Sequence, residues 1–514
     1  MINLKKFLSK IFSRLVFTVF LMLVQVAVLV IGIWKLNEKF YFVYALLTLL
    51  DIVLVIYINS QDENPSYKLS WIMLISIIPV FGGLTYLYLK IQFSRKIFIK
   101  AQERSTEYGN NYLHQSPDTQ ILLENENQSM SNLSKYVLNV SAYPVYNNTK
   151  VKYYSVGELQ FEDMITELKK AEKFIFMEYF IISAGYMFDT IADILKQKAK
   201  EGVEIRVMYD GVGTQINMPE KYFRELSECG IKCKIFNPFR PFLSSVQNNR
   251  DHRKILVIDG HTAFNGGTNL ADEYINRKER FGHWKDTALM IKGDAVWNLT
   301  VMFLQLWEID EPVLCNYLEF IPKYNVKGNF ANDGFVQPFS DSPLDDEHIG
   351  ELVYMDIINN SQKYLYITTP YLIPDNELLT SLKLSAKKGV DVRIITPHIP
   401  DKWYAYAIAW TYYPELIKAG VKIYEYTPGF IHAKNFVSDD NVGVVGTINL
   451  DYRSLYLHFE CATILYKSSA IKDIKNDFIE TQELSQLITL KDCSERPLKN
   501  KIAGYILRMF APLL

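Results

Sequence analysis

The chain has 514 residues and a formal net charge of −2, with 55 Lys and Arg against 57 Asp and Glu. This balance gives no overall attraction to nucleic acid, and the length is sufficient for two domains and a membrane anchor. The five cysteines are an odd number and include no Cys-x-x-Cys pair, so they argue against a disulfide framework and favour a reducing compartment.

Three apolar segments lie in the first 100 residues, at 15–34, 40–58 and 69–89. The first contains no charged residue and is about as long as a helix that crosses the bilayer core. It is too long for the apolar region of a cleaved signal peptide and lacks a small-residue cleavage site. The sequence therefore predicts a transmembrane helical anchor over residues 1–100 and a multi-pass location in the cell membrane.

Basic residues flank this anchor at both ends, within 5–14 and within 90–104, and each cluster favours the cytoplasmic side. Three full spans cannot place both ends in the cytoplasm. Either the first segment or the third, which Pro79 interrupts, is therefore interfacial or re-entrant. The basic exit and the reduced thiols favour a cytoplasmic catalytic part.

Residues 101–135 are rich in Gln, Asn, Ser and Glu and are predicted to form a polar linker with short ordered pieces. Two similar halves follow, 136–330 and 331–514, with the turn-rich NVKGNFANDG at their boundary. AEKFIFMEYFII in the first half aligns with SQKYLYITTPYLI in the second, and AKEGVEIRVMYD aligns with AKKGVDVRIITP. The latter pair has the helix end, Gly stop and buried strand of a βαβ unit. The sequence therefore predicts an α/β fold of two duplicated domains, paired about a pseudo-two-fold axis.

Both halves contain the spacing His-x-Lys-x-x-x-x-Asp. These residues are His252, Lys254 and Asp259 in the first half and His432, Lys434 and Asp439 in the second. A Gly and an Asn follow each His at 14 and 17 residues, and the two asparagines are Asn269 and Asn449. A two-fold axis that brings equivalent strand ends together would place both motifs in one cleft.

Two imidazoles and two ammonium groups in one cleft suit a phosphate ester, and this chemistry needs no metal. The lysines and asparagines would hold the non-bridging oxygens. One neutral imidazole would attack phosphorus to form a phosphohistidine, and the other, as imidazolium, would protonate the leaving oxygen. Each His needs a carboxylate that fixes its tautomer, and Asp286 and Glu460 are the candidates.

Several blocks of the chain resemble the phospholipase D superfamily, and specifically the bacterial cardiolipin synthases. They are RDHRKILVIDG, NGGTNLADEY, HWKDT, FIHAKNFVSD, GTINLDYRSLYLHFE and the terminal RMFAPLL, so the resemblance covers nearly the whole chain. It implies that the two His-Lys-Asp sets are catalytic, with Asp259 and Asp439 bracing the fold more than touching phosphate. The family often has Asn two residues before the acid at Glu460, where this chain has His458.

The resemblance implies a transferase that joins two phosphatidylglycerols of the bilayer into cardiolipin and releases glycerol, without a cofactor or nucleic acid. A membrane phospholipase D that hydrolyses phospholipids is an alternative, because both reactions use the same intermediate. An inactive membrane scaffold is a third possibility, but the presence of both His, both Lys and both Asn argues against it. The sequence leaves open which His is the nucleophile, the oligomeric state, and whether LKNKIAGYILRMFAPLL docks on the core or lies on the membrane surface.

Overall fold

The computed structural model describes residues 27, 30–32, 34–35, 41–90, 93–214, 218–238, 245–322, 332–345 and 347–513. The chain divides into two compact units. The first comprises Met1–Phe98, Pro238–Asn249 and Met509–Leu514, and the second comprises Ile99–Asn237 and Arg250–Arg508. Both halves of the sequence repeat lie in the second unit, so every candidate site residue belongs to one compact body.

The first unit contains helices α3 (Tyr41–Ser60), α4 (Pro65–Ile77) and α5 (Phe81–Lys90). The predicted segment 69–89 is broken near Pro79, because Val80 adopts a positive φ of 67° and its amide donates to the Asp51 carboxylate at 2.5 Å. Within the part of the chain that the structure describes, no helix combines the length and the apolar character of a membrane span. The predicted segment 15–34 falls almost wholly outside the described residues. The transmembrane anchor therefore stays a prediction.

The segment expected to be a polar linker forms helices α6 (Phe93–Asn110), α7 (Pro117–Glu126) and α8 (Gln128–Ser141). Asn127 begins α8 by accepting a hydrogen bond from the amide of Met130 at 3.0 Å, as N-cap residues do. The buried residues Met130, Leu133 and Val137 lie on one face of α8, which contacts the second half. A narrow apolar stripe in a polar sequence is therefore enough to dock this segment.

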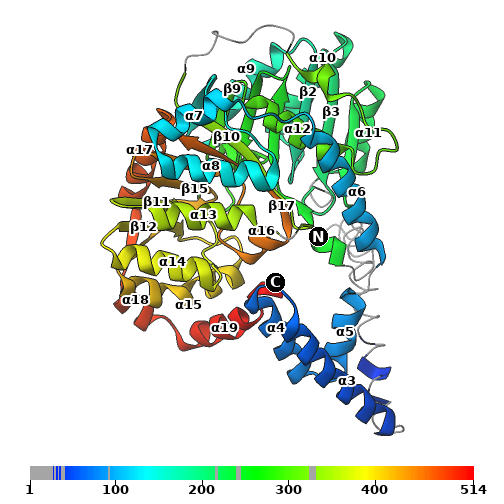
Figure 1. The fold of residues 1–514 in the computed structure, drawn as a ribbon, viewed down its shortest axis with the longest axis vertical. Helices are drawn as coiled ribbons and strands as arrows, with labels where there is room; N and C mark the ends of the chain where they lie inside the picture. The colour runs from blue at the N-terminus through cyan, green and yellow to red at the C-terminus, as the bar shows by residue number, and fades with distance from the viewer. Residues whose placement is uncertain are drawn as a thin grey trace, which may run out of the picture. The chain divides into compact units, whose positions relative to one another are not determined.

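The first half forms a seven-stranded sheet with the order β1-β9-β7-β6-β2-β3-β4. Its strands β9, β2 and β3 are labelled in Figure 1. Strands β2, β3 and β4 are parallel to one another, and the other neighbours are antiparallel. The strands are β1 (Thr149–Tyr154), β2 (Phe174–Tyr179), β3 (Glu204–Asp210), β4 (Lys232–Phe236), β6 (Lys254–Ile258), β7 (Thr262–Gly266) and β9 (Ala288–Gly293). The helices are α9 (Gly157–Lys169), α10 (Tyr186–Lys200), α11 (Glu220–Glu228) and α12 (Val296–Trp307).

The second half repeats this order strand for strand, as β10-β17-β16-β15-β11-β12-β13, and adds β18 at the far edge. The strands are β10 (Phe335–Asp341), β11 (Tyr364–Thr368), β12 (Asp391–Pro397), β13 (Lys422–Tyr426), β15 (Asn435–Ser438), β16 (Val442–Gly446), β17 (His458–Tyr466) and β18 (Ser485–Ile488). The helices are α13 (Ile349–Asn360), α14 (Asn376–Lys387), α15 (Trp403–Ala419), α16 (Tyr452–Tyr456), α17 (Ala470–Glu483), α18 (Leu490–Glu495) and α19 (Leu498–Met509). The common strand order confirms the predicted α/β fold of two duplicated domains.

Helix α12 joins the two halves into one core. It contacts β2, β6, β7 and β9 of the first half and β10 of the second, and all but one of its residues are buried. Phe303 of α12 stacks on Phe176 of β2 with ring centroids 4.7 Å apart. The halves therefore share one core and are not independent domains, because separating them would expose the apolar surface of this helix to water.

The last helix, α19, docks by one narrow edge. A Cβ on Gly504 would lie 2.5 Å from the carbonyl oxygen of Ala407 in α15, so the two backbones approach closely there. Leu498, Ile502 and Tyr505 are more than half exposed. The helix is thus docked on the second half but keeps an exposed apolar face. It has a feature of each alternative that the sequence left open, docking on the core and lying on the membrane surface.

Candidate active site

Each motif histidine follows a short strand that crosses to the other half. Strand β5 (Arg250–Asp251) leads into His252 and pairs in parallel with the start of β17, whereas β14 (Gly429–Ile431) leads into His432 and pairs in parallel with β8 (His283–Lys285). The amide of His252 donates to the carbonyl of Phe459 at 2.9 Å, and the amide of His432 donates to that of Lys285 at 2.7 Å. The same pairing thus occurs twice with the halves exchanged, as a two-fold axis would relate them.

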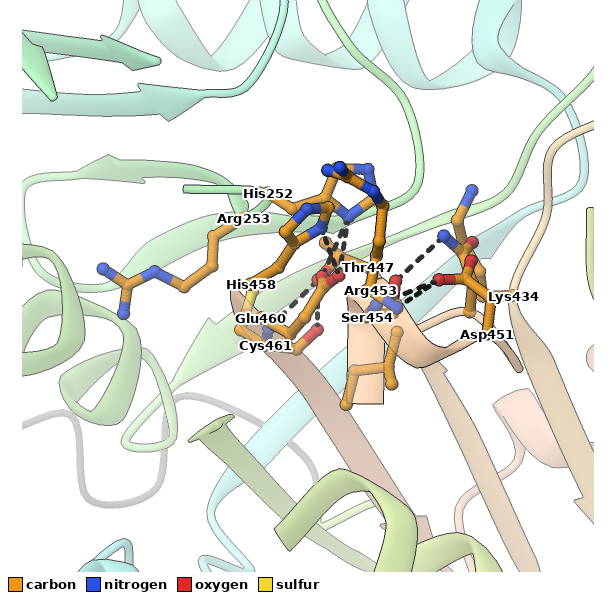
Figure 2. A network of polar contacts seen from close by, with 12 residues as sticks. His252, Arg253, Lys434, Thr447, Asp451, Arg453, Ser454, His458, Glu460 and Cys461 are labelled. Atoms are coloured by element: carbon orange, nitrogen blue, oxygen red, sulfur yellow. Dashed lines mark hydrogen bonds and ion pairs between the residues drawn. The ribbon is translucent and has the colours of Figure 1, made fainter. Parts of the chain in front are cut away.

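The acids predicted to orient the histidines lie just beyond these crossing points. His252 Nδ1 lies 2.8 and 3.0 Å from the two carboxylate oxygens of Glu460, and His432 Nδ1 lies 2.6 Å from Asp286 Oδ2 (Figure 2 shows the first pair). Both acids are fully buried, and both imidazoles are 7% exposed. An ionised carboxylate only accepts hydrogen bonds, so each pairing keeps the proton on Nδ1 and leaves Nε2 as the unprotonated nitrogen of a neutral imidazole. Each imidazole therefore takes its carboxylate from the opposite half.

The two motif lysines lie beside these pairs and are almost completely buried. Lys254 Nζ donates to the carbonyl of His252, and Lys434 Nζ donates to that of His432. Burial lowers the pKa of Lys254 to about 8, whereas burial and the charge of Lys254 lower the pKa of Lys434 to about 7. The two ammonium groups thus repel one another, which makes the site receptive to an anion.

Burial and neighbouring positive charge also lower the pKa of both motif imidazoles. The pKa of His432 falls to about 4, because burial and the charge of Lys434 outweigh the attraction of Asp286. The pKa of His252 falls well below its usual value through burial and through the charges of Lys254, Lys434 and His432. Groups from both motifs therefore act on one imidazole, so the fold brings the two motifs into one electrostatic environment.

The motif aspartates point away from this environment. Asp259 and Asp439 each adopt a positive φ, of 52° and 54°, in the turn that follows the motif strand. Each carboxylate accepts three backbone hydrogen bonds of 2.7 to 2.9 Å. The donors are the amides that open β2 and β11, those of Glu172, Lys173, Phe174, Gln362, Lys363 and Tyr364. The geometry accords with the bracing role that the resemblance implied.

The two asparagines predicted to contact substrate hold the loops after β7 and β16. Asn269 Oδ1 accepts from the amide of Ile181 at 2.9 Å, and its Nδ2 donates to the Tyr274 hydroxyl at 2.7 Å. Asn449 Nδ2 donates to the Ser454 hydroxyl at 2.9 Å. Each amide nitrogen carries a second N–H, so contact with a phosphate oxygen stays a prediction for both.

Comparison with known proteins places this geometry in a family. Residues 164–307 and 354–481 match the family model described as "Cardiolipin synthase, PLD-like domain", which together is more than half of the chain. The chain belongs to the cardiolipin synthase family of the phospholipase D superfamily. This confirms the resemblance, and it makes the protein a phosphatidyltransferase that acts on phospholipid.

Similar proteins support the same assignment to the cardiolipin synthase family. The chain is 35% identical over 461 residues to cardiolipin synthase 2 of Bacillus anthracis, covering 88% of each chain. It is 33% identical over 479 residues to a cardiolipin synthase of Halalkalibacterium halodurans, covering 91% of this chain and 93% of the relative. An uncharacterised protein of Streptococcus mutans is 47% identical over 459 residues, or 89% of this chain and 98% of the relative.

Two further matches concern the N-terminal region and the fold. Residues 45–90 match the family model described as "Phospholipase D-nuclease N-terminal". The crystal structure of a phosphatidylserine synthase from Haemophilus influenzae has a TM-score of 0.53 at 16% identity, and the match covers 75% of this chain and 98% of that one. That likeness supports the phospholipase D fold.

Sequence reasoning missed how unequal the two halves of this family site are. The Thr447 hydroxyl donates to Glu460, but the equivalent residue in the first half is Gly267, where a Cβ would lie 2.1 Å from Asp286 Oδ1. In the first half the shorter acid, Asp286, lies beside Gly267. In the second half the longer acid, Glu460, lies beside the hydroxyl of Thr447. The only sequence signal is position, since both residues stand 15 places after their motif histidine.

The surroundings of the two imidazoles differ as well. The ring of His432 contacts Tyr274, Trp284 and Phe430, with centroids 5.5 to 5.9 Å away. The ring of His252 contacts Phe180 at 5.1 Å and a third imidazole, His458, at 5.5 Å. The ring of His432 is thus surrounded by three aromatic side chains, whereas the ring of His252 lies between one aromatic side chain and an imidazole.

Two groups of described residues bring potential metal ligands within 4.8 Å of one another. They are His252 with His458 and Glu460, and Glu351 with Asp375 and Glu377. The first group coincides with the candidate site, where the charges of Lys254 and Lys434 oppose a divalent cation.

Proposed function

We propose that the protein is a cardiolipin synthase, which transfers the phosphatidyl group of one phosphatidylglycerol to a second and releases glycerol. The crossed pairing of His252 with Glu460 and of His432 with Asp286 carries this proposal. Two imidazoles of fixed tautomer, next to two lysines, provide the nucleophile, the acid and the positive charge that phosphoryl transfer needs. The relatives named cardiolipin synthases support the choice of substrate.

The first step forms a phosphohistidine. Nε2 of one imidazole attacks phosphorus, the N–P bond forms as the bond from phosphorus to the glycerol oxygen breaks, and the other imidazole protonates that oxygen. The lowered pKa values leave both imidazoles neutral in the free enzyme at pH 7. A bound phosphodiester offsets the charge of Lys254 and Lys434, which raises the imidazole pKa values and supplies the acid when substrate is present.

The second step reverses the roles. The imidazole that gave its proton takes one from a glycerol hydroxyl of the second phosphatidylglycerol, and this oxygen attacks the phosphohistidine. The N–P bond breaks, cardiolipin leaves, and the nucleophile is regenerated. Because one phosphodiester replaces another, the exchange needs neither a cofactor nor an energy source. Lys254, Lys434, Asn269 and Asn449 would hold the non-bridging oxygens throughout.

We also propose that the chain is a multi-pass membrane protein whose catalytic part faces the cytoplasm. Its parts would be the anchor at 1–100, a connecting segment at 101–135, and catalytic halves at 136–330 and 331–514. The apolar N-terminal segments, the basic residues around them and the match over 45–90 support this arrangement. A substrate that lies in the bilayer also requires a catalytic part held at its surface.

Product analysis tests the proposed reaction. The purified full chain is incubated with vesicles of pure phosphatidylglycerol, and the lipid products and free glycerol are quantified. Cardiolipin and glycerol in equal amounts support the synthase. Phosphatidic acid as the dominant product would identify a phospholipase D instead, and no turnover in a folded protein would favour the scaffold. His252→Ala is the control, since it should make neither product.

A further inference from the structure

His458 is a buried imidazole that the proposed mechanism does not use. It opens β17, two residues before Glu460, and its ring lies beside that of His252 with centroids 5.5 Å apart (Figure 2). It is 9% exposed, and neither ring nitrogen has a hydrogen-bond partner among the described residues. A buried polar group without a partner is costly. Both nitrogens of this ring lack one beside a motif histidine, so a ligand at this position would offset that cost.

The neighbouring carboxylate is already occupied by other groups. Glu460 Oε1 lies 2.8 Å from His252 Nδ1 but 3.8 Å from His458 Nδ1, beyond hydrogen-bond range. The Thr447 hydroxyl donates to the other carboxylate oxygen (Figure 2). His458 therefore does not hold Glu460 in place for its contact with His252. The ring nitrogens of His458 remain available to a bound molecule.

The two-fold symmetry of the site fails at this position. Trp284 stands two residues before Asp286, as His458 stands two residues before Glu460, and it lies 5.7 Å from the ring of His432. The first half therefore presents an indole where the second half presents an imidazole. A phospholipid is asymmetric too, with a headgroup on one side of the phosphate and acyl chains on the other. The difference between Trp284 and His458 could therefore distinguish these two sides.

Charge narrows the kind of ligand that His458 could bind. Burial lowers the pKa of His458 to about 3, because burial and the charges of His252 and Arg453 outweigh the attraction of Glu460, so the ring is neutral at pH 7. A neutral imidazole offers one N–H donor and one nitrogen acceptor. Phosphate oxygens already have Lys254 and Lys434, whose charges also oppose a metal ion. With phosphate oxygens and metal ions set aside, a hydroxyl group is the ligand that suits a neutral imidazole, because it can both donate and accept a hydrogen bond.

We propose that His458 is a specificity-determining residue that hydrogen-bonds a free hydroxyl of the glycerol headgroup beside His252. This rests on the proposed function and names the group that would recognise glycerol. The Asn that the family often has at this position also carries one donor group and one acceptor group, so it could make the same contact. Headgroups without free hydroxyls would leave His458 unpaired and are therefore disfavoured.

Comparison of two donor lipids tests this role. Vesicles of phosphatidylglycerol and of phosphatidylpropanol, which has the same carbon skeleton without free hydroxyls, are given separately to the full chain, and kcat/KM for headgroup release is measured. The wild type should prefer phosphatidylglycerol. His458→Phe, which keeps the ring and removes both nitrogens, should lower this preference about tenfold, the effect of one hydrogen bond. His458→Asn should retain the preference.

Trp284→Phe, at the symmetric position, is the matched control. It removes an indole N–H that also has no hydrogen-bond partner among the described residues, and it should not change the ratio of the two rates. His458→Leu replaces His458→Phe if the latter is unfolded by circular dichroism. An unchanged ratio in either folded variant would overturn the proposal, as would micromolar Zn²⁺ inhibition that His458→Asn abolishes, because this would mark a metal ligand. Headgroup release is common to transfer and hydrolysis, so a product of phosphatidic acid would refute the synthase without touching this inference.

Discussion

Replacing Asp286 by Asn should disable catalysis while leaving the fold intact. The substitution keeps the size of the side chain and removes its charge at 2.6 Å from His432 Nδ1. Asp286 is fully buried, so no solvent can take over its role. The attraction of this carboxylate supports the pKa of His432, which already lies at about 4. Without it, the imidazolium form of His432 that the proposed mechanism uses becomes still rarer.

The size of this effect follows from the separation of the charges. Charge centres roughly 4 Å apart, at an effective dielectric near 20, attract by about 4 kcal/mol. The Asn dipole replaces a small part of this, which leaves a loss of about 3 kcal/mol in the transition state. Because about 1.4 kcal/mol changes a rate tenfold, kcat should fall roughly 10²-fold or more.

The assay is cardiolipin formation from phosphatidylglycerol vesicles, with thermal unfolding of each variant measured in parallel. Asp439→Asn is the matched control, because Asp439 is a motif member but accepts only backbone hydrogen bonds. The substitution Asp439→Asn should lower the free energy of unfolding by about 1–3 kcal/mol. The kcat of the folded variant should stay within about threefold of that of the wild type. The reasoning fails if Asp286→Asn keeps full activity, or if Asp439→Asn loses activity as severely without loss of stability.

Three further predictions concern acid–base chemistry and metals. Lys434 has a pKa of about 7 in the free enzyme, so the ammonium proposed to hold phosphate loses its proton above pH 7. We therefore expect kcat/KM to fall as the pH rises above 7. A profile that is flat from pH 6 to 9 would contradict this. If His252 is the nucleophile, His432→Ala should slow release of glycerol far more than release of an activated phenolate, whereas His252→Ala should abolish both. The opposite pattern would exchange the roles. Activity should persist in EDTA, because the lysines supply the charge of a metal, and complete loss that one metal restores would refute this.

The sequence was sufficient to predict the architecture of the halves and to select the candidate residues of the motifs. A repeated βαβ pattern about 190 residues apart requires two similar folds, because the same local preferences act on both copies. The spacing from His252 to Asp259 recurs at His432 to Asp439, so the candidate residues could be selected without a structure. Polar composition misled only at 101–135, where the stripe on α8 is too narrow to stand out.

The pairing of each histidine with the acid of the other half was decided by the tertiary structure. The strands that bring His252 to Glu460 and His432 to Asp286 are two and three residues long, too short for any periodic signal. Their acid partners lie 208 and 146 residues away along the chain, so local propensity cannot specify them. Their backbone groups pair across the junction where α12 contacts the sheets of both halves, so the pairing depends on the packing of the two halves. The placement of His458 was also decided there, because its ring lies beside His252 of the first half and Glu460 of the second.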